Sequence, residues 1–140
     1  EVKRLHPLLP ITVIGRSLGT GVAAAVADLR QPEQLVLVTP FDSILNTVRG
    51  MYGWLPVELL LRDPFDSAAH LRNYQGPILV LRAGRDQVVL PERTDALLQS
   101  LRDKAVQVQA FAPANHSTIF RANGFWSAIE QFVDGQKKQA

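Results

Sequence analysis

The sequence predicts an α/β fold in which a mostly parallel sheet is flanked by helices. Three short apolar runs, at residues 11–14, 35–38 and 78–81, are separated by helical patterns. Continuous apolar strands that alternate with helices are typical of a parallel sheet covered on both faces. The 140 residues, of which 46% are hydrophobic and 20% charged, suffice for one domain with a real core. We therefore expect one domain over residues 1–140.

The first half of the chain contains two of these strands. Residues 1–5 are typical of the middle or end of a helix. The β-branched run at 11–14 indicates a buried strand, and a glycine-rich turn follows at 15–19. Residues 20–29 are almost all small or apolar, which indicates a helix buried on all sides. Residues 35–38 then form a second buried strand.

The second half repeats the alternation. Residues 78–81 indicate a third buried strand, and residues 91–101 a helix with proline in its first turn. Residues 106–111 alternate between apolar and polar, as expected of a less buried strand near a sheet edge. Residues 125–133 indicate a final helix. The intervening segment, 41–74, has prolines, aromatic residues and short helical patterns, so we expect it to form a helical cap-like excursion above the sheet.

Composition excludes several classes of function. The net charge is only +2, and no basic stripe interleaved with aromatic residues suggests nucleic-acid binding. The absence of cysteine excludes disulfides and thiolate sites, and fits the cytoplasm. No apolar run approaches the roughly 20 residues of a membrane span. No phosphate-binding or dinucleotide-binding glycine pattern occurs, and no spacing of potential ligands predicts a metal site.

The glycine-rich turn carries the first catalytic candidate. Gly15-Arg16-Ser17-Leu18-Gly19 lies between a predicted buried strand and a predicted buried helix. In that context a G-x-S-x-G pattern is typical of a nucleophile elbow, which lifts the serine hydroxyl above the sheet. We expect both glycines to be required because strand and helix crowd together there. Ser17 is the predicted nucleophile, and the amide of Leu18 is a predicted oxyanion donor.

A serine nucleophile needs a histidine base and a carboxylate that orients it. Asp86 follows the strand at 78–81, and His116 follows the strand at 106–111. In folds with a nucleophile elbow, the catalytic residues follow one another along the chain in the order Ser, Asp, His, as these three candidates do. All three candidates come just after the carboxyl ends of predicted strands, where open α/β sheets place their sites.

Non-catalytic interpretations of these residues remain open. Ser17 could belong to an anion-binding turn at a helix N-terminus, Asp86 to an ordinary turn, and His116 to a loop beside a helix cap. Asp42, which follows the strand at 35–38, is a rival acid. Arg16, Phe41, Met51 and Trp54 are candidates for lining a substrate pocket, although aromatic residues in such a segment more often form its core.

The chain resembles an α/β-hydrolase from its nucleophile strand to its end, and is most similar to serine hydrolases of the Bem46-like, abhydrolase-domain type. The resemblance covers nearly all of the chain and rests on Gly-Arg-Ser-Leu-Gly at 15–19, Asp-Pro-Phe-Asp-Ser at 63–67, residues 77–91 and Asn115-His116. It implies a Ser17, Asp86, His116 triad that hydrolyses carboxylic esters or related small acyl compounds without a cofactor. Members of this family often have glycine near the histidine, where this chain has Asn115.

The resemblance also implies several strands before the nucleophile strand and a second oxyanion amide from a loop among them. The chain is thus expected to be the C-terminal half of the hydrolase fold, with more of the natural protein upstream. We expect the strand that runs from Ile11 to Ile14 to be an apolar edge at which the chain forms a homodimer, or the chain to have little activity. Alternative functions are a catalytically incompetent interaction protein and an oligopeptidase-like peptidase.

Overall fold

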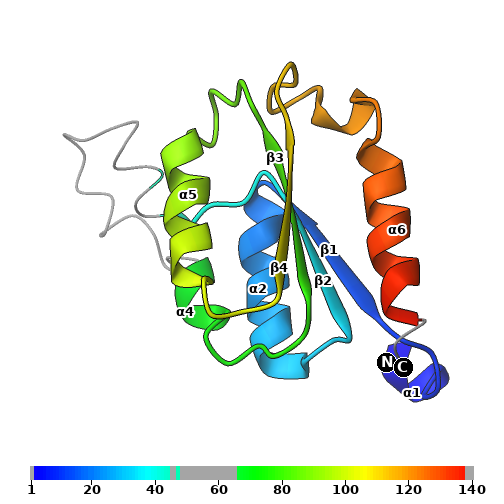
Figure 1. Cartoon of the computed structure of the whole chain (residues 1–140). Helices are drawn as coiled ribbons and strands as arrows, with labels where there is room; N and C mark the ends of the chain where they lie inside the picture. The colour runs from blue at the N-terminus through cyan, green and yellow to red at the C-terminus, as the bar shows by residue number, and fades with distance from the viewer. Residues whose placement is uncertain (1, 45–46, 48–65, 138–140) are drawn as a thin grey trace.

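The computed structural model describes residues 2–44, 47 and 66–137, and within them the predicted parallel sheet is confirmed. Four parallel strands lie in the order β1-β2-β3-β4, which is also their order along the chain (Figure 1). The strands are β1 (Thr12–Arg16), β2 (Gln34–Val38), β3 (Ile78–Ala83) and β4 (Val106–Phe111). Since all four run the same way, their carboxyl ends share one edge of the sheet.

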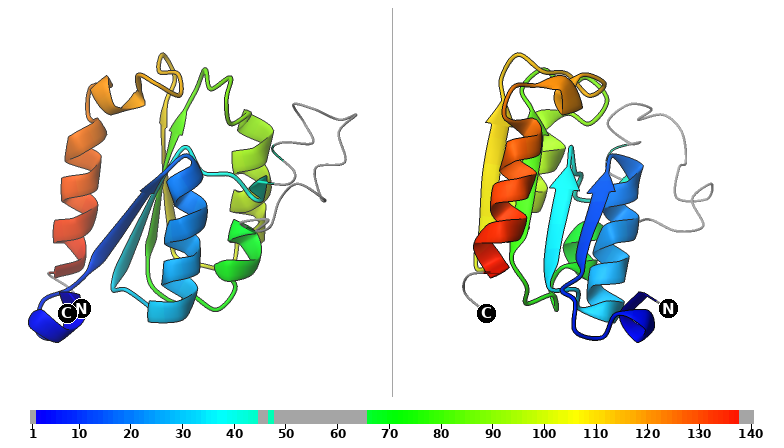
Figure 2. Two further views of the ribbon diagram at one scale, coloured as in Figure 1. Left: turned by 180° about the vertical axis from the view of Figure 1, so that it is seen from behind. Right: turned by 90° about the vertical axis from the view of Figure 1, so that its right-hand side faces the viewer.

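Helices connect the strands and cover both faces of the sheet. Figure 2 shows α2, α4 and α5 on one face and α6 on the other. A short helix, α1, precedes β1, and a 3-10 turn, η2, precedes α6. Their bounds are α1 (Val2–Leu5), α2 (Leu18–Arg30), α4 (Ser67–His70), α5 (Pro91–Ser100), η2 (Ile119–Arg121) and α6 (Phe125–Lys137).

The continuous apolar runs of β2 and β3 supply both halves of the core. Alternate side chains of a strand point to opposite faces, so a run of apolar residues suits a sheet that is covered twice. One cluster lies under α6 and includes Val36, Val38, Leu79 and Leu81. The other lies under α2, α4 and α5 and includes Leu35, Leu37, Ile78, Val80, Leu71 and Tyr74.

The two edge strands differ in polarity. β4 lies at the edge and is less buried, as predicted, but its burial does not alternate, because Val108 (49% exposed) and Ala110 are exposed together with Gln107 and Gln109. β1 forms the other edge; its Val13 packs on the α2 side, whereas Ile14 on the α6 side is 53% exposed. Pairing of this strand with a second copy of the chain remains a prediction.

The helix after β1 corrects one expectation. α2 begins at Leu18, directly after the serine, and buries a face of small residues against the sheet. Val22 and Leu29 on its other face are exposed, so α2 is not buried on all sides as its composition predicted. The alanines explain this arrangement, because they bring one face of the helix close to the strands while nothing in the described chain covers the other.

Only the ends of the expected cap-like segment fall within the described residues. Its last part packs beside α2 and α5, where Leu71 and Tyr74 are fully buried. The Tyr74 hydroxyl donates to the carbonyl of Pro32 at 3.0 Å. Burial, with a smaller contribution from the charge of Glu33, raises the pKa of Tyr74 to about 12. The pocket candidates Met51 and Trp54 lie outside the described residues.

None of the helices in the described ranges is both long and apolar enough to cross a bilayer.

Candidate active site

Three loops meet at the carboxyl edge of the sheet and bring the three predicted residues together. Ser17 stands between β1 and α2, Asp86 between β3 and α5, and His116 between β4 and η2. The loops at the carboxyl ends of neighbouring parallel strands converge, which is why sites form there in α/β proteins. The fold therefore joins residues that are 30 and 99 positions apart in the sequence.

Ser17 has the backbone of a sharp strand-to-helix turn. Its φ of 51° and ψ of −124° lie in a region that residues other than glycine rarely adopt. Three hydrogen bonds hold it there. Its amide donates to the carbonyl of Val38 on β2 at 2.9 Å, and its carbonyl accepts from the Thr20 amide at 2.8 Å. The Thr20 hydroxyl, which is fully buried, donates to the same carbonyl at 2.6 Å.

The two glycines that frame Ser17 are not equivalent, contrary to the sequence prediction. A Cβ on Gly15 would lie 2.5 Å from the carbonyl oxygen of Gly19 and 2.7 Å from the Cβ of Ala23. A Cβ on Gly19 would meet nothing within 4 Å. The crowding is thus one-sided: the end of β1 presses on the backbone of the first turn of α2, so only Gly15 requires the absence of a side chain.

Asp86 is held by main-chain amides in the turn that follows β3. Its Oδ1 accepts hydrogen bonds from the amides of Val88 at 2.9 Å and Val89 at 2.8 Å. The residue is only 7% exposed. These amides fix the orientation of the carboxylate, so its oxygens face the histidine rather than solvent.

His116 bridges the acid and the serine. Its Nδ1 lies 2.9 Å from Oδ2 and 3.1 Å from Oδ1 of Asp86, and its Nε2 lies 2.9 Å from Oγ of Ser17. An ionised carboxylate only accepts hydrogen bonds, so Nδ1 must carry the proton. In the neutral ring Nε2 is then an acceptor, and it receives the hydrogen bond from the Ser17 hydroxyl.

Main-chain contacts join the loops of Asp86 and His116. The amide of Gly84 donates to the carbonyl of Phe111 at 3.0 Å, and the amide of Arg85 to that of Ala114 at 2.9 Å. A Cβ on Gly84 would lie 2.6 Å from the backbone of Ala112, so glycine permits this close approach. The acid and histidine loops therefore form one rigid unit at the ends of β3 and β4.

Asn115 organises the turn that carries the histidine. Its Oδ1 accepts three hydrogen bonds of 3.0 Å, from the amides of Ser117 and Thr118 and from the Thr118 hydroxyl. Such a side-chain-to-backbone turn is a common use of asparagine before a helical segment. This contact gives Asn115 a structural reason at a position where glycine is frequent in the resembled family.

The structure also places three other candidate residues. The rival acid Asp42 faces Arg93, with Oδ2 3.3 Å from Nη1, whereas His116 bonds to Asp86. Phe41 is 3% exposed, so its side chain lies in the interior. Leu18 is the first residue of α2, and the first four amides of a helix have no partner within it.

Arg16 makes a contact that sequence reasoning missed. Its Nη2 donates to the carbonyl of His116 at 2.8 Å, and its guanidinium carbon lies 5.8 Å from the centre of the Phe120 ring. In the sequence, Arg16 was a candidate only because it lies next to Ser17. A contact between residues 100 positions apart cannot be read from a motif.

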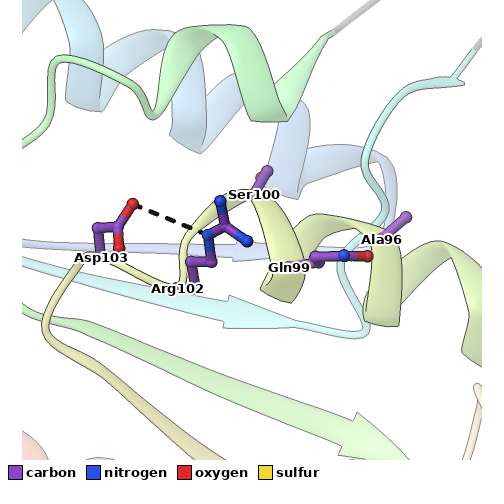
Figure 3. A pocket seen from close by; sticks show the side chains of 5 residues that line it. All are labelled: Ala96, Gln99, Ser100, Arg102 and Asp103. Carbon is purple, nitrogen blue, oxygen red and sulfur yellow. Dashed lines mark ion pairs between the residues drawn. The ribbon is translucent and has the colours of Figure 1, made fainter.

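A surface hollow of about 430 Å³ lies away from these residues, at the C-terminal end of α5 (Figure 3). Because α5 runs back from the carboxyl edge, its end lies toward the amino ends of the strands. The ion pair in the hollow joins Arg102 and Asp103, whose side chains are 75% and 94% exposed. Ion pairs between such exposed side chains contribute little free energy. Among the described residues, no group of three potential metal ligands occurs. The hollow is lined by Ala96, Gln99, Ser100, Arg102 and Asp103.

Comparisons with known proteins agree with this architecture. No family model matches the chain. An uncharacterized protein of Mycobacterium tuberculosis is 38% identical over 79 residues, which are 56% of this chain and 28% of that protein. An esterase of Pyrococcus furiosus matches with a TM-score of 0.70 and 22% identity, over 95% of this chain and 57% of that one. An acetyl xylan esterase from Paenibacillus matches with a TM-score of 0.72 and 19% identity, over 89% of this chain and 45% of that one.

Part of a peptidase also has this fold. The acylaminoacyl peptidase of Pyrococcus horikoshii matches with a TM-score of 0.71 and 15% identity, over 93% of this chain and 26% of that one. The chain thus has the fold of the α/β-hydrolases, as its motifs predicted, and spans little more than half of the esterase from Pyrococcus furiosus.

Proposed function

We propose that the protein is a serine hydrolase that acts on carboxylic esters or related acyl compounds. The observation that carries the proposal is the continuous hydrogen-bonded chain from Asp86 through His116 to Ser17, with contacts of 2.9 Å on either side of the imidazole. A nucleophile, a base within reach and a group that orients the base are the parts required for covalent acyl transfer.

The reaction follows from the protonation of these groups. As the Ser17 Oγ attacks the acyl carbon, its proton passes to Nε2 of His116, and the imidazolium is stabilised by Asp86. The histidine then gives that proton to the leaving oxygen or nitrogen, which departs and leaves an acyl-serine. A water molecule, deprotonated by the same nitrogen, attacks the acyl-serine, and the proton returns to Ser17. No net proton is consumed at the enzyme.

The amide of Leu18 is the proposed oxyanion donor in this chain. It follows the nucleophile directly and belongs to the first turn of α2, where the helix dipole also favours negative charge. In the resembled family a second donor comes from a loop that precedes the nucleophile strand, and the described residues of this chain give only the Leu18 candidate. The removal of one such donor costs about 10²–10³ in rate in a serine protease, so we expect slow turnover by the 140-residue chain alone.

Labelling with a fluorophosphonate probe tests the proposal on this chain. We expect the probe to modify Ser17 stoichiometrically and the Ser17→Ala variant to remain unlabelled. Ser117→Ala is the matched control, because it removes an exposed hydroxyl next to the same histidine. Two outcomes would contradict the proposal and favour a non-catalytic interaction protein. One is labelling that survives in Ser17→Ala. The other is that neither the wild-type chain nor a form extended at its N-terminus is labelled.

Substrate class is decided by comparing acyl donors. The esterases and the acylaminoacyl peptidase among the similar structures use one fold for different leaving groups. We expect p-nitrophenyl esters to be hydrolysed faster than short peptide amides. The opposite order would support an oligopeptidase-like activity instead.

A further inference from the structure

We infer that Arg16 is a positioning residue, which holds the histidine loop against the nucleophile elbow. The inference rests on the proposed function of Ser17 and His116. It concerns a residue that the sequence suggested only as part of a substrate pocket. Its basis is the 2.8 Å hydrogen bond from the guanidinium to the main-chain carbonyl of His116.

The strand order of the sheet keeps the nucleophile elbow and the histidine loop apart. β1, which ends at the nucleophile, and β4, which leads to the histidine, are separated by β2 and β3. The acid and histidine loops are joined to each other by main-chain hydrogen bonds. The elbow instead reaches the histidine loop through side chains, in the contact between Ser17 and His116 and in the one made by Arg16.

The pleat of β1 directs Arg16 toward the correct face. Residues two apart on a strand point to the same side, so Arg16 shares the face of Ile14. Their register partners on β2, Val38 and Val36, belong to the cluster under α6. The connection from β4 through η2 to α6 returns along this face and carries His116 and Phe120 with it (Figure 1).

Phe120 orients the guanidinium. The Arg16 side chain lies over the ring at 5.8 Å, and Arg121 lies over the same ring at 5.3 Å. A planar guanidinium can stack on an aromatic face while its N–H groups donate in the plane. The cation–π contact with Phe120 therefore accompanies a guanidinium whose Nη2 donates to the His116 carbonyl. Arg121 makes a cation–π contact with the same ring, and its described contact is with the ring alone.

The test compares Arg16→Ala with Arg121→Ala, because both variants remove a cation from Phe120 and only the first removes the donor to His116. The measured quantity is the second-order rate constant for labelling of Ser17 by the fluorophosphonate probe. We expect Arg16→Ala to lower it by about 10–100-fold, because small misplacement of a reacting group has that effect. We expect Arg121→Ala to stay within about twofold of wild type, and Arg16→Lys to recover part of the loss.

An independent measurement follows the imidazole itself. In ¹H–¹⁵N spectra of the ¹⁵N-enriched chain without the probe, Arg16→Ala should broaden or split the His116 Nδ1–H signal. Arg121→Ala should leave this signal as in wild type, and the thermal midpoints of both variants should stay near the wild-type value. An equal loss in both variants, or no loss in Arg16→Ala, would overturn the inference. If neither the wild-type chain nor the extended form is labelled, the hydrolase proposal fails, and the His116 signal still decides whether Arg16 holds the loop.

Discussion

The candidate site has two parts that are built by different means. The first comprises the loops of Asp86 and His116, which follow adjacent strands and are joined by main-chain hydrogen bonds. The second is the elbow of Ser17, which stands on an edge strand with a φ of 51° and packs tightly against its own helix. Asp86 and His116 are thus held by contacts between neighbouring loops, whereas Ser17 is held by the crowding of β1 against α2 and by a hydrogen bond to β2.

This difference separates two kinds of vulnerability. Changes in the acid and histidine part should affect the rate more than the folding, because Asp86 and Asn115 lie in loops beyond the strands. Changes in the elbow should affect both, because Gly15 belongs to β1 and contacts α2. The candidate site combines an Asp86–His116 pair, whose loops are joined by main-chain contacts, with the strained backbone of Ser17, and the two parts can be perturbed one at a time.

The largest expected effect comes from Asp86→Asn. The amide keeps the size of the side chain and one acceptor oxygen, but it no longer offers an ionised carboxylate to Nδ1 of His116. We expect the rate of Ser17 labelling to fall by about 10⁴, the loss seen when the equivalent change forces the wrong tautomer in a serine protease. The thermal midpoint should change little.

Asp42→Asn is the control for this variant, because Asp42 is the alternative acid and pairs with Arg93. Its labelling rate should remain near wild type. If Asp42→Asn is as damaging as Asp86→Asn, the assignment of the acid is wrong.

The second effect separates the two glycines of the elbow. Gly15→Ala places a methyl group against the Gly19 carbonyl and Ala23, and overpacking of this kind typically costs about 1–3 kcal/mol in the free energy of unfolding. Gly19→Ala meets open space in the first turn of α2 and should stabilise by about 0.5–1 kcal/mol. Urea denaturation of both variants measures these changes in the free energy of unfolding. Equal destabilisation by the two substitutions would contradict the one-sided packing.

Much of the fold was predictable because its signals are local. The apolar runs at 35–38 and 78–81 indicated β2 and β3, although β3 continues to Ala83. The sequence did not predict this extension because Arg82 is polar; its guanidinium pairs with Asp95 of α5 at 2.7 Å. The exposed outer face of α2 was not predictable, since composition does not reveal which side of a helix is covered.

The three residues of the candidate site were predictable, and most of the contacts that support them were not. Ser17, Asp86 and His116 followed from a motif, chain order and strand ends. The contact of Arg16 with His116 and the unequal glycines depend on distances between segments far apart in sequence. Asn115 carried a local signal, because asparagine before a turn often bonds to amides two and three residues on. That signal explains its three contacts better than comparison with glycine at this position.

The smallest expected effect concerns the histidine turn. Asn115→Ala removes the acceptor of three hydrogen bonds and leaves the amides of Ser117 and Thr118 to solvent. Loss of a comparable cap costs about 1 kcal/mol, so the free energy of unfolding should fall by that amount. The labelling rate of Ser17 should fall less than in Asp86→Asn, because the main-chain bond from Arg85 to Ala114 still holds the loop.

Asn115→Asp is the matched variant, because its carboxylate keeps an acceptor oxygen at the position of Oδ1. Urea denaturation should show that Asp restores most of the stability lost in Asn115→Ala. If Ala and Asp are equally destabilising, the turn is held by its backbone rather than by the side chain. The labelling rate could instead fall as far in Asn115→Ala as in Asp86→Asn. The histidine loop would then depend on this turn more than on its main-chain bonds to the acid loop, and the turn would be a third independent part of the site.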